Sequence, residues 1–530
     1  MFSALTPLDW KRRAVKYYPE KIAVIDEKKK FTYQEFGTRT DQLSMALHNS
    51  GIQEGDHVAV MLPNSHYMLE AFYGICQLGA VMVPLNYRLS AVDLEYIINH
   101  SDAKMLIVDA EFSGPIEEIK GNLSFNQIVI VSVAGHETTL KGVDYEDFLQ
   151  QSTENSTLPV VKIDENQLLT LNYTSGTTSK PKGVMLTHRS NYLNAANFMY
   201  HLNVKHDDVY LHTLPMFHAN GWGGVWSITA AGATHVCLRK VDPPVILELF
   251  ESENISLLCG APTVVNMLVN DPKAKNIKIK MSPRMATAGA PPSAALIQKA
   301  QDILGLNMIH VYGLTETSPF ILYCEWKKEF DSKSNDEQAV IKARQGIELA
   351  FNGETKVVNP EGEEVAWNGK ELGEIVTRGN VVMEGYYKDP EKTKEAIKDG
   401  WFYTGDLAVT YPDGFIEIQD RIKDLIISGG ENISSTEIEG VLYKHSDVME
   451  VAVIAVPDEK WGEIPKAIIV LQPDANVTEA EIITYCRSNM AHFKAPKAVE
   501  FVISLPKTAT GKLQKFRLRE MHWKGSKKVN

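Results

Sequence analysis

Cysteine is scarce in this chain of 530 residues, and its spacing excludes the sites that cysteine usually builds. The five cysteines are Cys76, Cys237, Cys259, Cys324 and Cys486. No two of them have the CxxC or Cys/His spacing of a metal site, and their odd number and wide separation argue against a disulfide framework. We therefore expect a reduced, cytoplasmic setting.

Long apolar runs and an excess of positive charge are also missing. No apolar run reaches the ~18 residues that a membrane-spanning helix needs, and the N-terminus lacks the apolar core of a signal peptide. The formal net charge of −13 argues against nucleic acid as a main partner, because no broad basic surface can be assumed. The one basic stretch, Lys507 to Lys528, is typical of a solvated tail. We expect no integral membrane association and no nucleic acid partner.

Two common nucleotide-binding motifs are absent as well. The segment "YTSGTTSKPKGV" (173–184) has the Gly, Ser, Thr and Lys content of a phosphate loop. Counted from Gly176, however, the sixth position is Pro181, where the GxxxxGK[ST] pattern requires glycine. No GxGxxG occurs that could open a dinucleotide-binding fold. The loop must therefore serve another kind of phosphate chemistry, if it binds phosphate at all.

The composition of this loop still suits a polyphosphate. Gly176 allows a close approach of the backbone, successive N–H groups can form an anion nest, and neighbouring hydroxyls add donors. Lys180 and Lys182 supply positive charge. A Ser/Thr/Gly run is more often a flexible linker, but this one lies between two apolar segments, "LLTLN" and "GVML", that are predicted strands. A strand-to-strand loop is therefore favoured.

The length and the pattern of the chain predict at least two domains. Strand and helix patterns alternate over 57–109, with strands expected at 57–62, 81–85 and 105–109 and helices at 65–80 and 90–100, which predicts parallel sheets covered by helices. The polar stretch 327–342 reads as a surface excursion. A smaller α/β pattern follows a boundary near Asp420 to Asp424. It has strands at 448–456, 467–471 and 498–503, and a helix that Thr478 caps and that runs through His492.

Seven motifs, in order, carry a resemblance to a known family. The loop "YTSGTTSKPKG" is followed by "LPMFHANGWG" (214–223), "AGAPP" (288–292), "VYGLTET" (311–317), "YTGDL" (403–407), "DRIKDLIISGGENISSTEIE" (420–439) and "PKTATGKLQK" (506–515). The chain thereby resembles the adenylate-forming superfamily, and in particular its acyl-CoA synthetase and fatty acid–CoA ligase branch. Ser179 stands where the family usually has glycine, which concerns only the local conformation of the loop.

The resemblance implies an α/β fold with two domains. A large N-terminal AMP-binding domain, residues 1–422, would consist of two helix-covered sheets and a small β-barrel. A smaller, mobile α+β lid domain, residues 423–530, would rotate about a hinge at Lys423. One orientation would insert a lysine for adenylation, and the other would bring in a glycine loop for thiol transfer.

The implied reaction has two steps, because a carboxylate cannot acylate a thiol directly. The acid first reacts with ATP to give acyl-AMP and pyrophosphate, and AMP then serves as the leaving group when a thiol attacks. The first step concentrates negative charge, so the site should act mainly through electrostatics. ATP and CoA are the expected co-substrates, and Mg²⁺ the expected cofactor.

Three residues are implied as catalytic: Glu316, Lys512 and His218. Glu316 resembles the Mg²⁺ ligand of the family, with Thr174 on the other side of the metal, and hard oxygen ligands suit this ion. Lys512 resembles the lysine that bridges the substrate carboxylate and the α-phosphate. A lone glutamate or lysine is more often simply solvated, and only the flanking motif letters favour these roles.

The nucleotide site is implied by a larger set of residues. Tyr312 and Gly289 to Pro291 resemble an adenine pocket, while Asp406 and Arg421 resemble ribose or phosphate contacts. Tyr312 could instead be a core residue, and Asp406 could cap a turn. The full expected set for ATP and AMP is Thr174, Ser175, Gly176, Thr177, Thr178, Lys182, Gly289, Ala290, Pro291, Val311, Tyr312, Gly313, Thr315, Asp406, Arg421 and Lys423.

The acyl pocket and the thiol tunnel complete the expected site. His218, Trp222 and Gly313 are implied in the pocket, with Trp222 at the position of a gating tryptophan. The tunnel residues would be Gly429, Gly430 and Glu431. For His218 and Trp222, plain core packing is the alternative.

The acid and the acceptor are identified less closely. A medium- or long-chain fatty acid is favoured, in fatty acid and lipid metabolism, and the alternatives are a short-chain, thioether or aryl acid–CoA ligase or an enzyme that loads a carrier protein. No acid near His218 could bind an amino group, which disfavours amino acids. No carrier module follows the last motif, so free CoA is the favoured acceptor. A phosphate-loop ATPase or kinase is a distant alternative, and a homodimer is compatible with the sequence.

Overall fold

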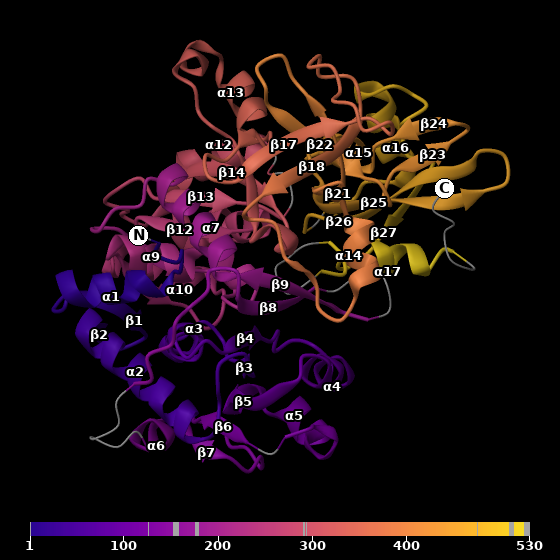
Figure 1. The fold of residues 1–530 in the computed structure, drawn as a ribbon. Helices are drawn as coiled ribbons and strands as arrows, with labels where there is room; N and C mark the ends of the chain where they lie inside the picture. The colour runs from indigo at the N-terminus through magenta and orange to yellow at the C-terminus, as the bar shows by residue number, and fades with distance from the viewer. Residues whose placement is uncertain are drawn as a thin grey trace.

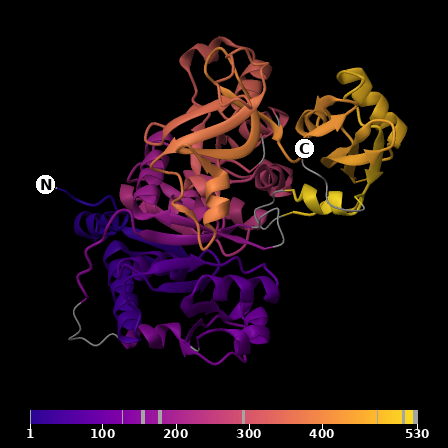
Figure 2. The ribbon, with the colours of Figure 1, turned by 45° about the vertical axis from the view of Figure 1, so that its right-hand side comes forward.

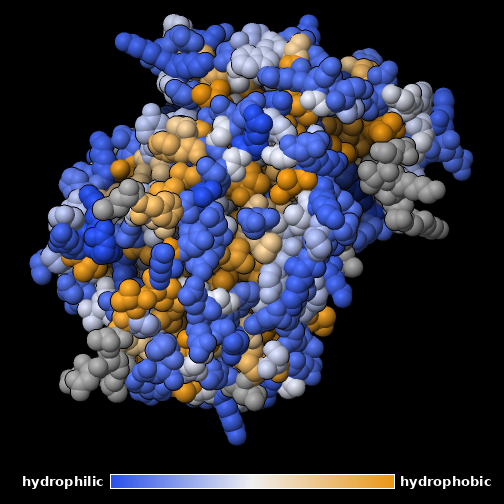
Figure 3. Space-filling model, viewed as in Figure 1, coloured by the Kyte–Doolittle hydropathy of each residue, from blue (hydrophilic) through white to orange (hydrophobic). Residues whose placement is uncertain are grey.

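The computed structural model describes residues 2–125, 127–151, 158–174, 180–289, 292, 294–473, 475–507 and 513–523. The chain forms a large N-terminal domain and a smaller C-terminal lobe, which stands apart from the rest in the turned view (Figure 2). None of the described helices is both long and apolar enough to cross a membrane. Hydrophilic residues cover most of the face shown in Figure 3, and apolar residues show between them in small patches.

The first sheet has eight strands, in the order β19-β9-β8-β4-β3-β5-β6-β7 (Figure 1). Most neighbours are parallel, and β8 pairs with β9 antiparallel. The strands span β3 His57–Met61, β4 Val81–Pro84, β5 Ala103–Asp109, β6 Ile128–Val131, β7 Val143–Asp144, β8 Leu168–Thr174, β9 Lys182–Thr187 and β19 Gly385–Tyr386. The strands predicted at 57–62, 81–85 and 105–109 are confirmed as β3, β4 and β5. Their continuous apolar runs are buried, as expected for parallel strands that helices cover on both faces.

The second sheet has nine strands, in the order β16-β15-β14-β13-β12-β10-β11-β1-β2. The strands span β1 Ile22–Asp26, β2 Lys29–Thr32, β10 Val209–His212, β11 Thr234–Cys237, β12 Leu257–Gly260, β13 Arg284–Thr287, β14 Asn307–Gly313, β15 Phe320–Tyr323 and β16 Ile347–Glu348. One large core, with Phe36, Phe72 and Trp226 among its buried members, packs helices of the first half against both sheets. The two sheets therefore form one body.

The helices of the large domain connect these strands. They span α1 Leu8–Tyr17, α2 Tyr33–Asn49, α3 His66–Cys76, α4 Ala91–His100, α5 Gly114–Ile119, α6 Tyr145–Gln150, α7 His188–His201, α8 Ala219–Trp222, α9 Gly224–Ala231, α10 Pro243–Ser252, α11 Pro262–Asn270, α12 Ala294–Leu304, α13 Asn335–Lys342 and α14 Pro390–Ala396. The helices predicted at 65–80 and 90–100 are present as α3 and α4. The stretch 327–342, expected as a surface excursion, is mostly helical, and its Phe330 and Ile341 are buried against Phe415.

A third, antiparallel sheet of five strands lies where the small barrel was expected. Its described pairings run β17-β18-β21-β20, and β22 joins β21. The strands span β17 Gly353–Val358, β18 Gly373–Gly379, β20 Ile397–Lys398, β21 Trp401–Thr410 and β22 Ile416–Arg421. This sheet leads the chain directly to the C-terminal domain.

The C-terminal domain has its own sheet and its own core. The sheet order is β24-β23-β26-β25, and β27 pairs with β26. The elements span β23 Ile426–Ser428, β24 Glu431–Ile433, α15 Ser435–Leu442, β25 Val448–Asp458, β26 Gly462–Leu471, α16 Glu479–Asn489, β27 Ala498–Phe501 and α17 Lys515–Glu520. Thr478 caps α16 as predicted, but the helix ends at Asn489, three residues before the expected His492.

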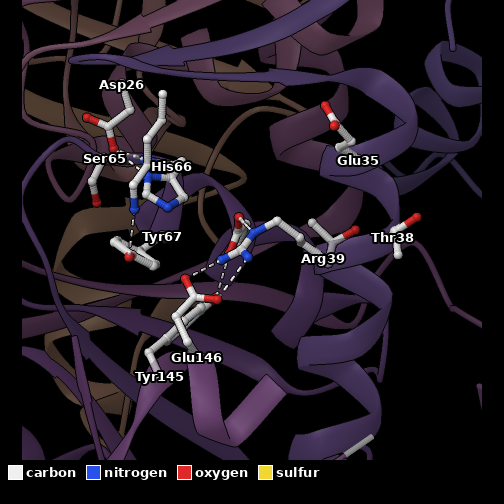
Figure 4. Close-up of polar contacts among 12 residues, drawn as sticks. Asp26, Glu35, Thr38, Arg39, Ser65, His66, Tyr67, Tyr145 and Glu146 are labelled. Atoms are coloured by element: carbon white, nitrogen blue, oxygen red, sulfur yellow. Dashed lines mark hydrogen bonds and ion pairs between the residues drawn. The ribbon is translucent and has the colours of Figure 1, made fainter. Parts of the chain in front are cut away.

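A buried ionic network fastens three helices of the large domain (Figure 4). Arg39 on α2 binds Glu70 on α3, with 2.6 Å between Nε and Oε1, and Glu146 on α6, with 2.9 Å between Nη2 and Oε1. Tyr145 donates to Glu70 at 2.9 Å. Because the Glu70 side chain is 1% exposed, it needs this partner, and a buried pair is costly to break from one side.

Candidate active site

The two strands that flank the glycine-rich loop fix its ends. Thr174, the last residue of β8, is the cross-strand partner of Lys182, the first residue of β9. The loop is thus a strand-to-strand connection, as the sequence predicts. Its residues Ser175, Gly176, Thr177 and Thr178, and the unusual Ser179, lie outside the described residues. Because they are cross-strand partners, Thr174 with its hydroxyl and Lys182 with its ammonium group lie on the same face of the sheet at the base of the loop.

Glu316 lies close to the base of this loop. It belongs to the short helix η4, Thr315–Thr317, which packs beside β9. The Tyr386 hydroxyl donates to Glu316 Oε1 at 2.9 Å, and Lys182 Nζ lies 4.5 Å from the centre of the Tyr386 ring. One tyrosine therefore connects the carboxylate with the lysine of the loop.

Tyr386 is a site residue that the motif comparison did not identify. It lies on β19, far from the motifs in sequence, in the polar-aromatic run "MEGYY". Burial and the Glu316 carboxylate raise the pKa of Tyr386 well above its usual value, so the phenol stays protonated and keeps donating to Glu316. Only the pairing of β19 with β9 brings it here, and no local sequence signal gives that pairing.

The backbone around Glu316 requires glycine at one position. A Cβ at Gly313 would overlap the Pro319 carbonyl oxygen, so no larger residue fits without moving the chain. Val311 is buried in a core cluster, and Thr315 is 9% exposed. Gly289, at the other nucleotide motif, has φ of +90°, a conformation that favours glycine. Ala290 and Pro291 lie outside the described residues.

Tyr312, Asp406 and Arg421 form a second polar cluster. The Tyr312 hydroxyl donates to Asp406 Oδ2 at 2.6 Å, and Arg421 Nε lies 3.2 Å from Asp406 Oδ1. Asp406 and Arg421 are cross-strand partners on β21 and β22. Burial and Asp406 raise the pKa of Tyr312 well above its usual value. Asp406 is 4% exposed and thus has charge-assisted partners on both oxygens.

The two clusters belong to one electrostatic environment. Burial lowers the pKa of Arg421, but Asp406, Asp424, Tyr312 and Glu316 outweigh it and raise that pKa. The guanidinium therefore lies within electrostatic range of Glu316 as well as Asp406. A buried guanidinium that is paired with one carboxylate and senses a second can add positive charge for an incoming polyanion.

The segment between the domains carries a dense set of charges. Asp420, on β22, accepts from the Ser435 backbone N–H at 2.6 Å at the start of α15. Asp424 pairs with Arg519 of α17, and burial raises the pKa of Asp424 while Lys515 and Arg519 outweigh that effect and lower it. Lys515 Nζ lies 2.7 Å from Glu439 Oε1. These contacts fix α17, which begins three residues after Lys512; Lys512 itself lies outside the described residues.

A run of left-handed backbone carries the next motif. The φ values from Ala219 to Gly223 are +37°, +50°, +55°, +55° and +87°, although the three residues here that have a Cβ, Ala219, Asn220 and Trp222, disfavour or only tolerate this region. Asn220, 1% exposed, holds the run in place. Its amide donates to Thr170 Oγ1 at 2.9 Å and to Asn191 Oδ1 at 2.8 Å. A buried polar network thereby offsets the strain of the turn.

His218 and Trp222, at the two ends of this turn, differ in how deeply they are buried. His218 precedes the turn and is half-buried. Trp222 is 6% exposed and packs edge-on against Phe320, with ring centroids 5.8 Å apart. It shares a buried cluster with Val311 and Ala288, each of which lies in a nucleotide motif. Trp222 is therefore both a packed core residue and a neighbour of the expected nucleotide site.

The expected thiol-tunnel residues lie in the C-terminal domain, beside an exposed tryptophan. Gly429 has φ of +62° and donates to the Trp461 carbonyl at 2.8 Å. Among the described residues, no hydrogen bond or ion pair joins Gly429, Gly430 or Glu431 to the nucleotide motifs of the large domain. Trp461 is 40% exposed, and Lys497 Nζ and Lys460 Nζ lie 4.1 and 4.8 Å from its ring centre. The motif comparison did not identify this cationic aromatic surface.

Comparison with known proteins agrees with this arrangement. A family model described as AMP-binding enzyme matches residues 11–387, and one described as AMP-binding enzyme C-terminal domain matches residues 437–512. The chain is 44% identical to 4-hydroxybutyrate–CoA ligase 2 of Metallosphaera sedula over 523 residues, covering 98% of this chain and 94% of that protein. It is 40% identical to 2-methylpropanoate–CoA ligase CCL4 of Humulus lupulus, covering 98% and 95%.

A solved structure shares the fold of the whole chain. The anthranilate CoA ligase AuaEII in complex with anthranoyl-AMP superposes with a TM-score of 0.88 at 26% identity, covering 98% of each chain. The match extends over both domains.

Lys423 provides a test of the electrostatics between the domains. Burial, and then the neighbouring Arg421, lower the pKa of Lys423 to about 8, because both disfavour its charged form. We expect the acetylation rate of Lys423, followed by mass spectrometry of peptides after brief acetic anhydride treatment, to rise with a midpoint near pH 8. Lys392, whose pKa Asp389 raises, is the internal control and should react at higher pH. A midpoint for Lys423 at or above the usual value of about 10.4 would contradict the expectation.

Proposed function

Because the chain belongs to the AMP-binding enzyme family and is a member of its acyl-CoA synthetase branch, we propose that the described residues activate a short carboxylic acid as acyl-AMP and pass it to CoA. The observation that supports the residue roles is a pair of charged clusters: Lys182 and Glu316 both contact Tyr386 at the base of the loop, and Asp406 pairs with Arg421, whose pKa Glu316 also helps to raise. Such a set can receive a triphosphate, a metal ion and a ribose together.

Adenylation needs charge neutralisation more than covalent help from the protein. A carboxylate oxygen of the acid attacks the α-phosphorus of ATP, and the bond to the β,γ-pyrophosphate breaks. Lys182 and the loop that it closes would hold the phosphates, and Arg421 would add positive charge at the α-phosphate or ribose. Positioning plus electrostatics is the usual catalytic mode of such transfers.

Glu316 and Thr174 would hold Mg²⁺. The donor set fits this ion, since a carboxylate and a hydroxyl are hard oxygen ligands, and Mg²⁺ is usually bound by one or two carboxylates with phosphate oxygens and water completing the octahedron. The Tyr386 hydroxyl orients one oxygen of Glu316, which leaves the second for the metal. Bound there, the ion would neutralise phosphate charge.

The ribose and the base would occupy the second cluster. Asp406 can accept from ribose hydroxyls, and in this structure Tyr312 and Arg421 already orient both of its oxygens. Positive φ at Gly289 lets the backbone approach the base closely. We assign Val311, Gly313 and Thr315 to the floor of this site because they carry and shape the strand between the two clusters.

Lys512 and the hinge would connect the two steps. The resemblance gives Lys512 the role of bridging the carboxylate and the α-phosphate, and α17 anchors its loop through Lys515. β22 ends at Arg421 and β23 begins at Ile426, so only four residues separate the two domains' sheets. This supports a boundary between residues 422 and 423, with Lys423 as hinge.

The C-terminal surface supports CoA as the acceptor. Trp461 offers an exposed aromatic face and Lys460 and Lys497 lie over it, so the surface can stack an adenine and pair with phosphates. It adjoins Gly429, the start of the expected tunnel. A carrier protein presents the same thiol arm without the adenine, and the surface favours free CoA over it.

The pocket favours a short acid over a medium- or long-chain fatty acid. Trp222 is packed against Phe320 and buried, so in the expected acyl pocket it would limit the length of the tail, and His218 would border this pocket. The similar ligases are named for 4-hydroxybutyrate and 2-methylpropanoate, both of four carbons. We therefore propose that the enzyme acts in the metabolism of short acids rather than of long-chain lipids.

We propose that the protein works in the cytoplasm. All five cysteines are free and buried, which agrees with a reducing compartment such as the cytoplasm. A homodimer stays an expectation from the sequence.

Lys512 separates the two half-reactions. We expect Lys512→Ala to reduce formation of acyl-AMP from ATP by about a hundredfold or more, because the bridging cation is lost. Transfer of supplied acyl-AMP to CoA should stay within about threefold of the wild-type rate, since the lysine leaves the site for that step. Release of AMP and pyrophosphate, each assayed separately, checks both; an equal loss in the two half-reactions, or ADP as the product, would overturn the mechanism. Lys507→Ala is the neighbouring control.

Trp222 tests the length of the acid. We expect Trp222→Gly to shift the preferred acid from about four carbons to longer chains, because the substitution opens the pocket while glycine suits the positive φ at this position. The readout is kcat/KM for AMP release over a series of straight-chain acids. Trp226→Phe, in the neighbouring core, should leave the preference unchanged. A wild-type optimum at eight or more carbons would restore the medium- or long-chain assignment.

Trp461 tests the acceptor. We expect Trp461→Ala to raise the KM for CoA by roughly fivefold to a hundredfold, since stacking contributes about 1–3 kcal/mol per base, and to leave acyl-AMP formation unchanged. With pantetheine, which lacks the nucleotide, variant and wild type should match. Trp367→Ala, at another exposed tryptophan, is the control. An unchanged KM for CoA would remove Trp461 from the acceptor site.

A further inference from the structure

The helix α4 contacts the chain on both sides of the proposed phosphate loop. His100, the last residue of α4, lies beside Tyr173, which precedes Thr174 in β8, with 2.7 Å between the Tyr173 hydroxyl oxygen and His100 Nδ1. Tyr96, on the same helix, lies beside Lys180, near the other end of the loop, with 5.2 Å between Lys180 Nζ and the centre of the Tyr96 ring. Neither helix residue has a role in the steps above.

Both contacts come from one face of the helix. Tyr96 and His100 are four residues apart and therefore lie on the same side of α4, and their ring centres are 5.1 Å apart. Burial, and then the charge of Lys388, lower the pKa of His100, and Lys180 lies near enough to add to this effect. One helix face thus meets the chain where it enters the loop and where it leaves the loop.

This contact is on the opposite side of the strands from the proposed phosphate site. Successive residues of a strand point to opposite faces, so Tyr173 lies on the other face from Thr174. Its cross-strand partner is Gly183, and a Cβ at Gly183 would lie 3.1 Å from Tyr173 Cζ. Glycine therefore leaves room for the Tyr173 ring to lie against β9 and reach His100 from behind the loop.

The bond between Tyr173 and His100 joins two neutral groups. Burial raises the pKa of Tyr173 well above its usual value, so its phenol stays protonated, and the lowered pKa of His100 keeps the imidazole neutral near pH 7. Tyr173 and Tyr96 also pack against the buried core of the first sheet. The start of the loop is therefore attached to a rigid part of the domain without adding charge.

A loop of this composition gains from such an attachment. The segment 174–180 consists of Gly, Ser, Thr and one Lys, and ordering such a chain around a ligand costs conformational entropy. Binding is stronger when part of this ordering is present before the ligand arrives. Holding the chain at both ends leaves fewer residues to be ordered by the phosphates themselves.

We propose that Tyr96 and His100 are positioning residues that hold the two ends of the phosphate loop for the β- and γ-phosphates of ATP. The inference rests on the proposed function, because it assumes that the loop binds these phosphates. Neither residue would touch the nucleotide: His100 acts through Tyr173, and Tyr96 acts through Lys180.

The test compares ATP with AMP, which lacks the β- and γ-phosphates. We expect His100→Leu and Tyr173→Phe each to raise the Kd for ATP by about threefold to tenfold, because each removes the same hydrogen bond. Tyr96→Leu should raise it by about twofold to fivefold, since an exposed cation–π contact is weaker. The Kd for AMP should stay within about twofold in all three variants. Titration calorimetry at one fixed Mg²⁺ concentration measures both nucleotides.

Three further readouts distinguish positioning from a merely structural role. The double variant of His100→Leu and Tyr173→Phe should bind ATP no more weakly than either single variant, because both changes remove one shared bond. His100→Asn, whose amide can replace the ring nitrogen, should recover most of the ATP affinity. Transfer of supplied acyl-AMP to CoA should keep its wild-type rate throughout, since no pyrophosphate takes part in that step.

Tyr387→Leu is the matched control. Tyr387 lies beside α4 as well, and Lys388 Nζ lies 5.2 Å from the centre of its ring, the same distance as between Lys180 and Tyr96. Its hydroxyl, however, donates to Asp102 at 2.7 Å and not to a residue that flanks the loop. The Kd values of this variant for ATP and AMP should both equal those of the wild type.

The outcomes separate the inference from the proposed function. The positioning role is overturned if the Kd values for ATP and AMP rise together, if no variant weakens ATP, or if the effects of His100→Leu and Tyr173→Phe multiply in the double variant. Short-acid activation then still stands, provided that the wild type releases AMP and pyrophosphate. If the wild type releases neither product with any short acid tested, the proposed function fails and the inference fails with it. Tyr173→Phe, which removes a single oxygen atom, decides if His100→Leu does not fold.

Discussion

The constraint on which the proposed acyl side of the site depends is the left-handed turn from Ala219 to Gly223. Left-handed backbone is unfavourable for residues with a Cβ, by about 1–2 kcal/mol each, and a run of it persists only where the surroundings fix it. The buried Asn220 amide does so, through Thr170 on β8 and Asn191 on α7. One network thus ties the strand that leads into the phosphate loop to the turn that carries Trp222.

The proposed nucleotide side depends on a different interaction, in which neutral tyrosine hydroxyls donate to charged carboxylates and orient them. Tyr386 fixes Glu316 and Tyr312 fixes Asp406, and burial keeps both phenols protonated. Each carboxylate is therefore oriented before any ligand arrives, which is how an electrostatic site avoids reorganisation during the reaction. The two tyrosines come from different sheets, so the site depends on how the first and second sheets meet.

Sequence alone predicted the parts of this protein that local patterns encode. Buried strands such as His57–Met61 read as continuous apolar runs, and Thr478 with Glu481 marked the start of α16. The ordered motifs gave Glu316, Asp406 and Arg421. Tyr386 and Trp461 could not be found this way, because each acquires its place through strand pairing or a turn that joins distant segments. The helix at 335–342 carries the same kind of local signal, a capping box of Ser334 and Glu337, whereas the burial of its Ile341 beside Phe415, far along the chain, has no local signal.

If the C-terminal domain rotated about Lys423, as proposed, the contacts that cross the hinge would have to break. The pairs of Asp424 with Arg519 and of Lys515 with Glu439 lie within the C-terminal side and would move together. Among the described residues, the side-chain hydrogen bonds that cross the hinge join the Ser435 N–H to Asp420, and the Ser434 and Thr436 hydroxyls to the Gln419 carbonyl. All three hydrogen bonds join one end of α15. Water can replace the two hydroxyl bonds at a net cost of about 0.5–1.5 kcal/mol each, whereas the bond to the Asp420 carboxylate contributes about 1.5–3 kcal/mol. Asp420 also lies within electrostatic range of Lys515, on the other side of the hinge, so a rotation would have to weaken this charged interaction as well as break the hydrogen bonds.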